Sequence, residues 1–212
     1  MSGEFKVVLE ARKRTRELLC AGSKVEAGMR EVVEMCAERC VEDWSPFRWV
    51  QWGGSAIKFA QRFRACLESE PPEPQINGLW LGLFNPVVKE ETILDCYLAG
   101  NDGFAPEAID WPCGPKYWPE ARYFEIPALA ELYRLANENA DRPGSSAEQA
   151  LGESFVALST LAVVTELAPK LPILNQRDFG ISYGFDSGDF LFLGTLAHGQ
   201  FRVGTNDAPR RE

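Results

Sequence analysis

Residues 68–75, ESEPPEPQ, constrain the fold of this chain more than any other feature. Prolines fix the backbone angle φ and remove amide donors, so this stretch continues neither a helix nor a central strand. The apolar pattern also changes here, from a helical period before the segment to an alternating period after it. We therefore expect an exposed, acidic linker between a helical part, 1–67, and a sheet-plus-helix part, 76–204.

The part before the linker is expected to be helical. Residues 5–42 predict two helices that are interrupted near AGSK at 21–24, and Met29, Val33 and Cys36 recur at helical spacing in the second. A further helix is expected to follow the glycines at 53–54 and to end near residue 67.

The part after the linker combines strands and helices. Two β-prone runs, 77–88 and 91–100, are expected to pair antiparallel, and 177–196 is predicted to form a hairpin that turns at 186–188. Residues 200–204 predict an edge strand. Ser145 and Glu148 fit the capping box S-x-x-E, and the apolar helix that follows is expected to be buried.

These patterns predict an α+β fold with an antiparallel sheet of about four or five strands covered by helices, and with a helical N-terminal third. A length of 212 residues fits a single domain, 1–212, and residues 205–212 are expected to be a disordered tail.

The net charge of −9 disfavours binding to nucleic acid, because an acidic chain repels phosphate backbones, and it favours a basic surface on a protein partner. The alternative is that the acidity serves only to keep the protein soluble. The N-terminus has no apolar stretch typical of an export signal. The apolar run at 155–167 is short for a membrane span. We expect a cytoplasmic protein that binds no membrane.

The sequence offers little for histidine-, nucleotide- or metal-dependent chemistry. His198 is the single histidine, and the motifs G-x-S-x-G, G-x-x-x-x-G-K-S/T, G-x-G-x-x-G and C-x-x-C do not occur. A pair formed by Cys113 and His198 is the remaining nucleophile hypothesis, against a loop cysteine and a turn histidine without such a role. We therefore assign no catalytic residue, metal site or cofactor.

An enzyme that uses carboxylate side chains is an alternative function. Two of them could act in acid–base chemistry or hold a divalent metal ion. The candidates lie in the predicted sheet region: Asp95, Asp102, Asp110, Asp186 and Asp189. Aspartate and glycine are also the residues that a hairpin turn prefers.

Aromatic residues gather on a segment that proline makes irregular. Residues 110–119, DWPCGPKYWP, contain three prolines, two tryptophans and a tyrosine. Such a loop either folds back as a lid on the core or presents rigid anchors to a partner. Trp49 and Trp52 are three apart, so a helix would place them on one face. The predicted partner-binding residues are Trp49, Trp52, Trp111, Tyr117, Trp118, Asp186 and Asp189.

The function predicted from these features is non-enzymatic protein binding. The profile of a small, acidic α+β protein with aromatic loops is similar to that of bacterial immunity proteins, which neutralise a toxin by binding it. The likeness is one of composition and predicted architecture, and it gives no residue a role. The alternatives are the carboxylate-based enzyme and a structural or scaffold subunit.

Overall fold

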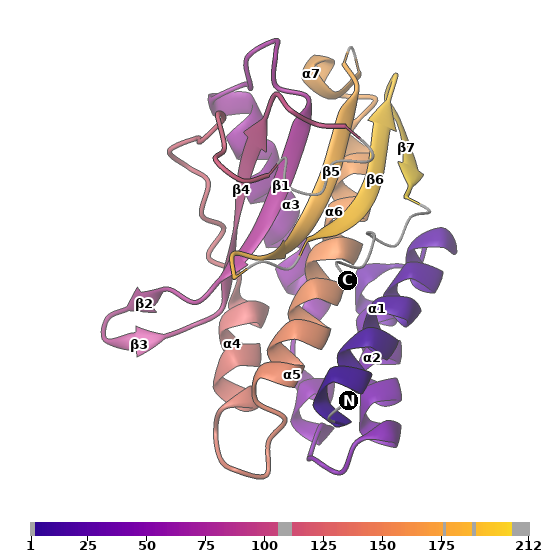
Figure 1. Ribbon diagram of the computed structural model, residues 1–212, viewed down its shortest axis with the longest axis vertical. Coiled ribbons are helices and arrows are strands. Elements are labelled where there is room, and N and C mark those ends of the chain that lie inside the picture. The colour runs from indigo at the N-terminus through magenta and orange to yellow at the C-terminus, as the bar shows by residue number, and fades with distance from the viewer. Residues whose placement is uncertain (1–2, 106–111, 176, 188–189, 205–212) are drawn as a thin grey trace. The chain divides into compact units, whose positions relative to one another are not determined.

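The computed structural model describes residues 3–105, 112–175, 177–187 and 190–204, and it has the predicted α+β fold (Figure 1). The predicted tail, 205–212, lies outside the described residues. The chain forms two compact units. Unit 1 comprises Met1–Phe59, Phe84–Asp95 and Glu125–Ser159, and unit 2 comprises Ala60–Leu83, Cys96–Phe124 and Thr160–Glu212.

Unit 1 is mainly helical. Its elements are α1 (Gly3–Cys20), α2 (Val25–Arg39), the 3-10 helix η1 (Ser45–Trp49), the start of α3 (Trp52–Ser69), α4 (Pro127–Ala136), α5 (Ser145–Ala147), the π-helix η2 (Glu148–Gly152), the start of α6 (Glu153–Leu167), and a hairpin of β2 (Val87–Val88) and β3 (Glu91–Thr92). The break between α1 and α2 confirms the interruption predicted at 21–24.

Close packing of helices explains why the predicted apolar stripe of α2 is buried. Met29, Val33 and Cys36 are fully buried. A side chain at Gly28 would place its Cβ 2.9 Å from the Cδ1 of Leu158, so the glycine lets α2 and α6 approach each other. The stripe therefore belongs to the core of unit 1.

Some of the polar groups that are buried in unit 1 form pairs between helices. Arg12 forms a bidentate ion pair with Glu153, with N–O distances of 2.7 Å, and the Glu153 side chain is only 2% exposed. The hydroxyls of Thr15 and Ser154 share a hydrogen bond of 2.7 Å. These contacts join α1 to α6.

The predicted capping box at 145–148 is wrong. Gly144, at φ 53°, takes the N-cap position of α5, and Ser145 is already the first helical residue. The carboxylate of Glu148 instead accepts hydrogen bonds of 3.0 Å from the Nδ2 atoms of Asn85 and Asn137. A glycine that reaches positive φ at little cost therefore replaces the side-chain cap.

Unit 2 is built on a sheet with the strand order β4-β1-β5-β6-β7. The strands are β1 (Gly78–Phe84), β4 (Asp95–Asn101), β5 (Phe179–Phe185), β6 (Leu191–Ala197) and β7 (Gln200–Val203). The structure confirms the predicted hairpin as the antiparallel pair β5–β6, and the predicted edge strand as β7. Strands β1 and β4, the two predicted β-prone runs, are neighbours.

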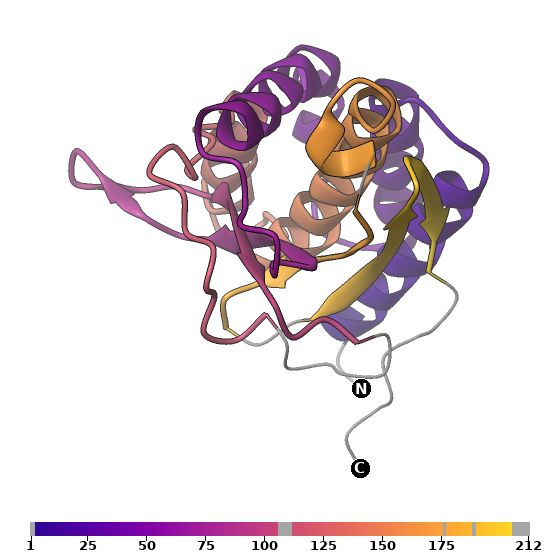
Figure 2. The same ribbon diagram turned by 90° about the horizontal axis from the view of Figure 1, so that it is seen from above.

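β1 pairs in parallel with β5, Gly78 opposite Gly180, and both strands lie in the interior of the sheet, with a strand on either side. The C-terminal parts of α3 and α6 cover one face of the sheet (Figure 2). On the other face, a Cβ atom at Gly180 would lie 2.0 Å from the Cε2 atom of Phe104. The Phe104 ring therefore fills the space that a side chain at this position would need. Ile181, the next residue in the strand, consequently points to the helical side.

Candidate binding surface

The segment 116–124 lies along the outer edge of β4. Its backbone exchanges hydrogen bonds of 2.9 Å between Tyr117 and Gly100, and the Leu98 and Phe124 amides continue the contact through the carbonyls of Arg122 and Cys96. Pro119 lies inside the segment and supplies no amide donor. The segment therefore covers the edge of β4 without becoming a regular strand that would expose a new edge.

Tyr117 and Trp118 point to opposite sides of this extended segment, as successive residues of extended backbone do. The Tyr117 hydroxyl donates a hydrogen bond of 2.7 Å to the Glu70 carbonyl, just beyond α3, where a helix leaves carbonyls unpaired. Burial raises the pKa of Tyr117, with contributions from Cys66 and Glu70. Tyr117 thus acts as a lid on the core, whereas the Trp118 side chain is 43% exposed.

Four residues form what we call the Trp118 surface: Tyr97, Trp118, Arg122 and Tyr123. The rings of Tyr97 and Trp118 meet nearly edge-to-face, with centroids 5.2 Å apart. The Arg122 guanidinium lies 4.6 Å from the Trp118 ring and 4.7 Å from the Tyr123 ring, in cation–π geometry. Trp118 and Tyr123 are exposed by 43% and 42%, so both offer apolar area to a partner.

Hydrogen bonds fix the ring of Tyr97, the most buried member of this surface. The Trp80 Nε1 donates to the Tyr97 hydroxyl at 3.2 Å, and that hydroxyl donates to Asp186 Oδ1 at 2.6 Å. Burial, and then the bond to Asp186, raise the pKa of Tyr97. Burial also raises the pKa of Asp186, against the opposing effect of the Tyr97 hydroxyl. Asp186 therefore holds the surface in place from a turn that follows β5.

The other predicted partner-binding residues separate in the structure. Trp49 lies on η1 in unit 1 and is 81% exposed, but Trp52 is 1% exposed and packs against Phe155. The expectation that Trp49 and Trp52 share one face is therefore wrong, because η1 ends at Trp49 and a new helix begins at Trp52. Trp52 and Tyr117 are core residues and offer no anchor on a surface. Trp111 and Asp189 lie outside the described residues.

Sequence reasoning did not single out Tyr97, Arg122 and Tyr123. Successive residues of β4 point to opposite faces of the sheet, so Tyr97 lies on the other face from the core-facing Cys96 and Leu98. This alternation could have identified Tyr97 from the sequence. Arg122 and Tyr123 become informative only when the segment 116–124 is known to pair with β4, which no local pattern shows.

The candidate carboxylates have separate structural roles. Asp95 is buried and accepts hydrogen bonds from the amides of Glu125 and Ile126, at 2.9 and 3.1 Å, just before α4. Asp102 forms an ion pair of 2.6 Å with Lys116. Asp110 lies outside the described residues. In the described ranges, no group of three or more His, Cys, Asp or Glu residues could hold a metal ion.

The candidate nucleophile pair occupies two loops of unit 2. His198 has a φ of 49° in the turn between β6 and β7, and its amide donates to Asp178 Oδ1 at 3.2 Å. Cys113 is exposed, and its carbonyl accepts a hydrogen bond from Asn101. Both residues thus have backbone roles in shaping their loops.

No protein family, curated protein or solved structure matches this chain. One helical run among the described residues, Ser145–Leu167, is long and apolar enough to cross a membrane, but 78% of its most apolar window is buried within the protein. Such burial is typical of the core helix of a soluble protein.

Proposed function

We propose that this protein is a non-enzymatic binding module that contacts a protein partner through the Trp118 surface. The observation that carries the proposal is that Trp118 and Tyr123 are half-exposed yet held in place by Arg122 and Tyr97. Aromatic and arginine side chains dominate binding energy at interfaces, and a surface that is ordered before binding loses little entropy.

The partner that we propose is basic. The protein has a net charge of −9, which attracts a positively charged surface and speeds the encounter. In its most concrete form, the protein is a bacterial immunity protein that neutralises a toxin in the cytoplasm by direct binding. Trp49, 81% exposed on η1, is a second candidate anchor.

The test is a pull-down with the tagged protein from lysate of the native host, at low and moderate salt. We expect one basic protein in nearly equal amount, and less of it at moderate salt. Trp118→Ala and Tyr123→Ala should each reduce capture, by about tenfold for a central anchor.

Val41→Ala is the control, because Val41 is apolar and fully exposed and is not one of the residues of the Trp118 surface. The circular dichroism spectrum of each variant establishes that it is folded. Equal capture by folded Trp118→Ala, folded Tyr123→Ala and the wild type would contradict the proposed surface.

A further inference from the structure

The hairpin of β2 and β3 extends away from the helices of unit 1 (Figure 1, Figure 2). All its residues from Val87 to Thr92 are exposed, and the two valines, Val87 and Val88, are exposed by 70% and 45%. A two-stranded hairpin is only marginally stable in water, whereas a sheet of three strands with an apolar face is stable. The hairpin thus carries the β-branched side chains of a sheet but has no third strand beside them in the described part of the chain.

The hairpin is nevertheless fixed at its base and at its tip. At the base, Asn85 Nδ2 donates a hydrogen bond of 3.0 Å to the buried Glu148 carboxylate. At the tip, Lys89 and Glu90 have φ values of 52° and 70°, which suit the tight turn between two short strands. Residues other than glycine rarely adopt such angles, and strain of this kind is concentrated in functional segments. Because the hairpin is ordered before it binds, binding costs it little entropy.

The register of the hairpin directs the backbone groups of one residue pair outward. The Ile93 amide donates to the Pro86 carbonyl at 3.0 Å, and bonded and non-bonded pairs alternate in an antiparallel ladder. The adjacent pair, Val87 and Thr92, is therefore a non-bonded one. The amide and carbonyl of Thr92 point to the outer edge of β3, and those of Val87 point to the outer edge of β2.

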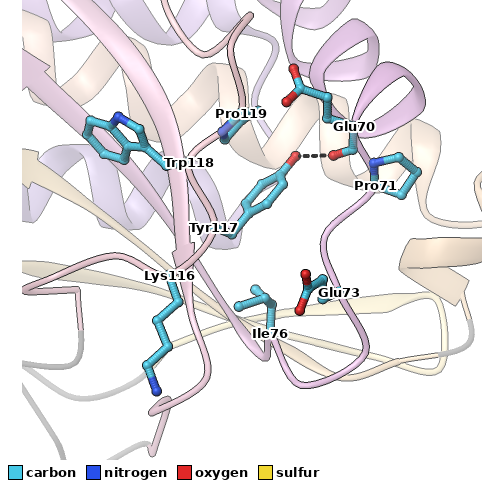
Figure 3. Close-up of a pocket in the computed structure, with 8 residues that line it drawn as sticks. All are labelled: Glu70, Pro71, Glu73, Ile76, Lys116, Tyr117, Trp118 and Pro119. Carbon is cyan, nitrogen blue, oxygen red and sulfur yellow. Dashed lines mark hydrogen bonds between the residues drawn. The ribbon is translucent and has the colours of Figure 1, made fainter.

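The chain covers another sheet edge with its own backbone. In unit 2, the segment that carries Tyr117 pairs with β4 at Gly100, and the Tyr117 hydroxyl ties it to the Glu70 carbonyl (Figure 3). Among the described residues, no segment pairs in this way with the outer edge of β3. An open edge with free amides and carbonyls is a template for a strand of another molecule.

Charge favours the β3 edge and a basic occupant. Glu90 and Glu91 lie on this side of the turn, and within the described ranges neither carboxylate has an ion pair or a hydrogen bond. Antiparallel pairing of two β3 strands would bring four such carboxylates close together, which disfavours a second copy of this chain as the occupant. Lysine or arginine residues on an incoming strand would instead face opposite charge.

We propose that the outer edge of β3 binds an extended, basic segment of the protein partner as a third strand. The proposal rests on the proposed function and adds a contact in unit 1 that is separate from the Trp118 surface. The residue opposite Thr92 exchanges two backbone hydrogen bonds with it, and its apolar side chain extends the face that carries Val87. The residues on either side of it are basic and lie on the opposite face, where one of them pairs with Glu91.

The test uses two acetylated and amidated peptides, one of four lysine–valine repeats and one of four glutamate–valine repeats. Each is titrated into the ¹⁵N-labelled protein at low salt, while amide resonances and hydrogen exchange are recorded. We expect the lysine peptide to shift the resonances of 90–93 in a saturable manner and to slow exchange of the Thr92 amide, which becomes a hydrogen-bond donor. The glutamate peptide should do neither, and added salt should weaken binding of the lysine peptide.

A matched pair of proline variants distinguishes the two edges. Thr92→Pro removes the outward amide of β3, and Val87→Pro removes the corresponding amide of β2, while neither amide serves as a donor inside the hairpin. Thr92→Pro should abolish the saturable shifts at 90–93, and Val87→Pro should retain them. Glu91→Gln should weaken binding of the lysine peptide by about two- to fivefold, as expected for an exposed ion pair. Glu38→Gln, which removes an exposed charge from α2, should leave the affinity unchanged.

Equal shifts with both peptides, or wild-type affinity in Thr92→Pro, would overturn the third strand. Glu91→Gln decides where proline disturbs the hairpin, because glutamine leaves the backbone unchanged, and wild-type affinity in this variant would also overturn it. A dimer in light scattering that Thr92→Pro dissociates would assign the edge to a second copy instead. Partner capture that Thr92→Pro retains and Trp118→Ala loses would leave the proposed function intact and reject the third strand.

Discussion

The Tyr117 hydroxyl donates a hydrogen bond of 2.7 Å to the Glu70 carbonyl, and this bond ties the segment along β4 to the chain just beyond α3. The adjacent residue, Trp118, is 43% exposed and lies under the Arg122 guanidinium. The proline-rich loop consequently forms the lid that its composition suggested, at Tyr117, and the role of Trp118 as an anchor stays a prediction. It closes the core with one aromatic residue and presents the next one to solvent.

Tyr117 and Trp118 should therefore respond differently to truncation. Tyr117→Ala should lower the free energy of unfolding by about 3 kcal/mol or more, because it empties a buried site. Tyr117→Phe removes only the hydroxyl, and should cost about 1 kcal/mol. Trp118→Ala should cost less than Tyr117→Ala, since the indole is half-exposed. Urea denaturation measures all three, and an equal loss for Trp118→Ala would show that Trp118 is a core residue.

Local patterns predicted the elements of this fold better than their long-range pairing. The β5–β6 hairpin and the α1–α2 break depend on residues that are close in sequence, so periodicity and turn residues identify them. The parallel contact between β1 and β5 joins distant segments, and nothing within either strand specifies it. Similarly, only the pairing of 116–124 with β4 brings Arg122 and Tyr123 to the candidate surface, whereas Trp118 was found from composition alone.

The buried ion pair between Arg12 and Glu153 should be much more important for stability than a surface pair. Glu153→Ala removes the carboxylate beside the partly buried Arg12 guanidinium and should lower the free energy of unfolding by about 3 kcal/mol. Glu166→Ala on the same helix removes the exposed pair with Lys170 and should change stability little. Thermal and urea unfolding compare the two variants. Similar losses in both would contradict the structural role of Glu153.

A side chain at Gly82 should destabilise the folded protein. An alanine Cβ there would lie 2.3 Å from ring atoms of Tyr97, so the ring must move away from its bond to Asp186. Gly82→Ala should cost about 1–3 kcal/mol and alter the near-ultraviolet circular dichroism of the aromatic residues. Gly54→Ala is the control, because Gly54 lies in α3 with open space around it and alanine favours helix. A wild-type spectrum for Gly82→Ala would argue against the close contact.

The cysteines should differ strongly in reactivity. At pH 8, a thiol reagent should modify the exposed Cys20 and Cys113 first, and the buried Cys36, Cys66 and Cys96 only after unfolding. Burial raises the pKa of Cys36 to about 12 and that of Cys66 to about 11, which disfavours their reactive thiolates. Mass spectrometry of digested protein identifies the modified positions. Rapid modification of Cys36 in the folded protein would contradict the packing of α2.

The raised pKa values of Cys36 and Cys66 also predict how the free energy of unfolding changes at alkaline pH. Their pKa values are higher in the folded protein than the ordinary value of 9.0, so the folded state holds these protons more tightly. The stabilisation that these two thiols contribute to the folded state is therefore complete below about pH 9, and it is lost as the pH rises from 9 towards 12. Denaturation midpoints measured across this range for the wild type and Cys36→Ala should fall more steeply in the wild type.

The pairing of Gly78 with Gly180 also has a consequence during synthesis. A ribosome that adds about 5–20 residues per second needs roughly 5–20 s to make the chain between these two positions. During that interval β1, which is apolar on both faces, has no β5 beside it. A nascent chain in this state is prone to aggregation, and expression at reduced temperature or with a chaperone that shields apolar segments should increase the soluble yield.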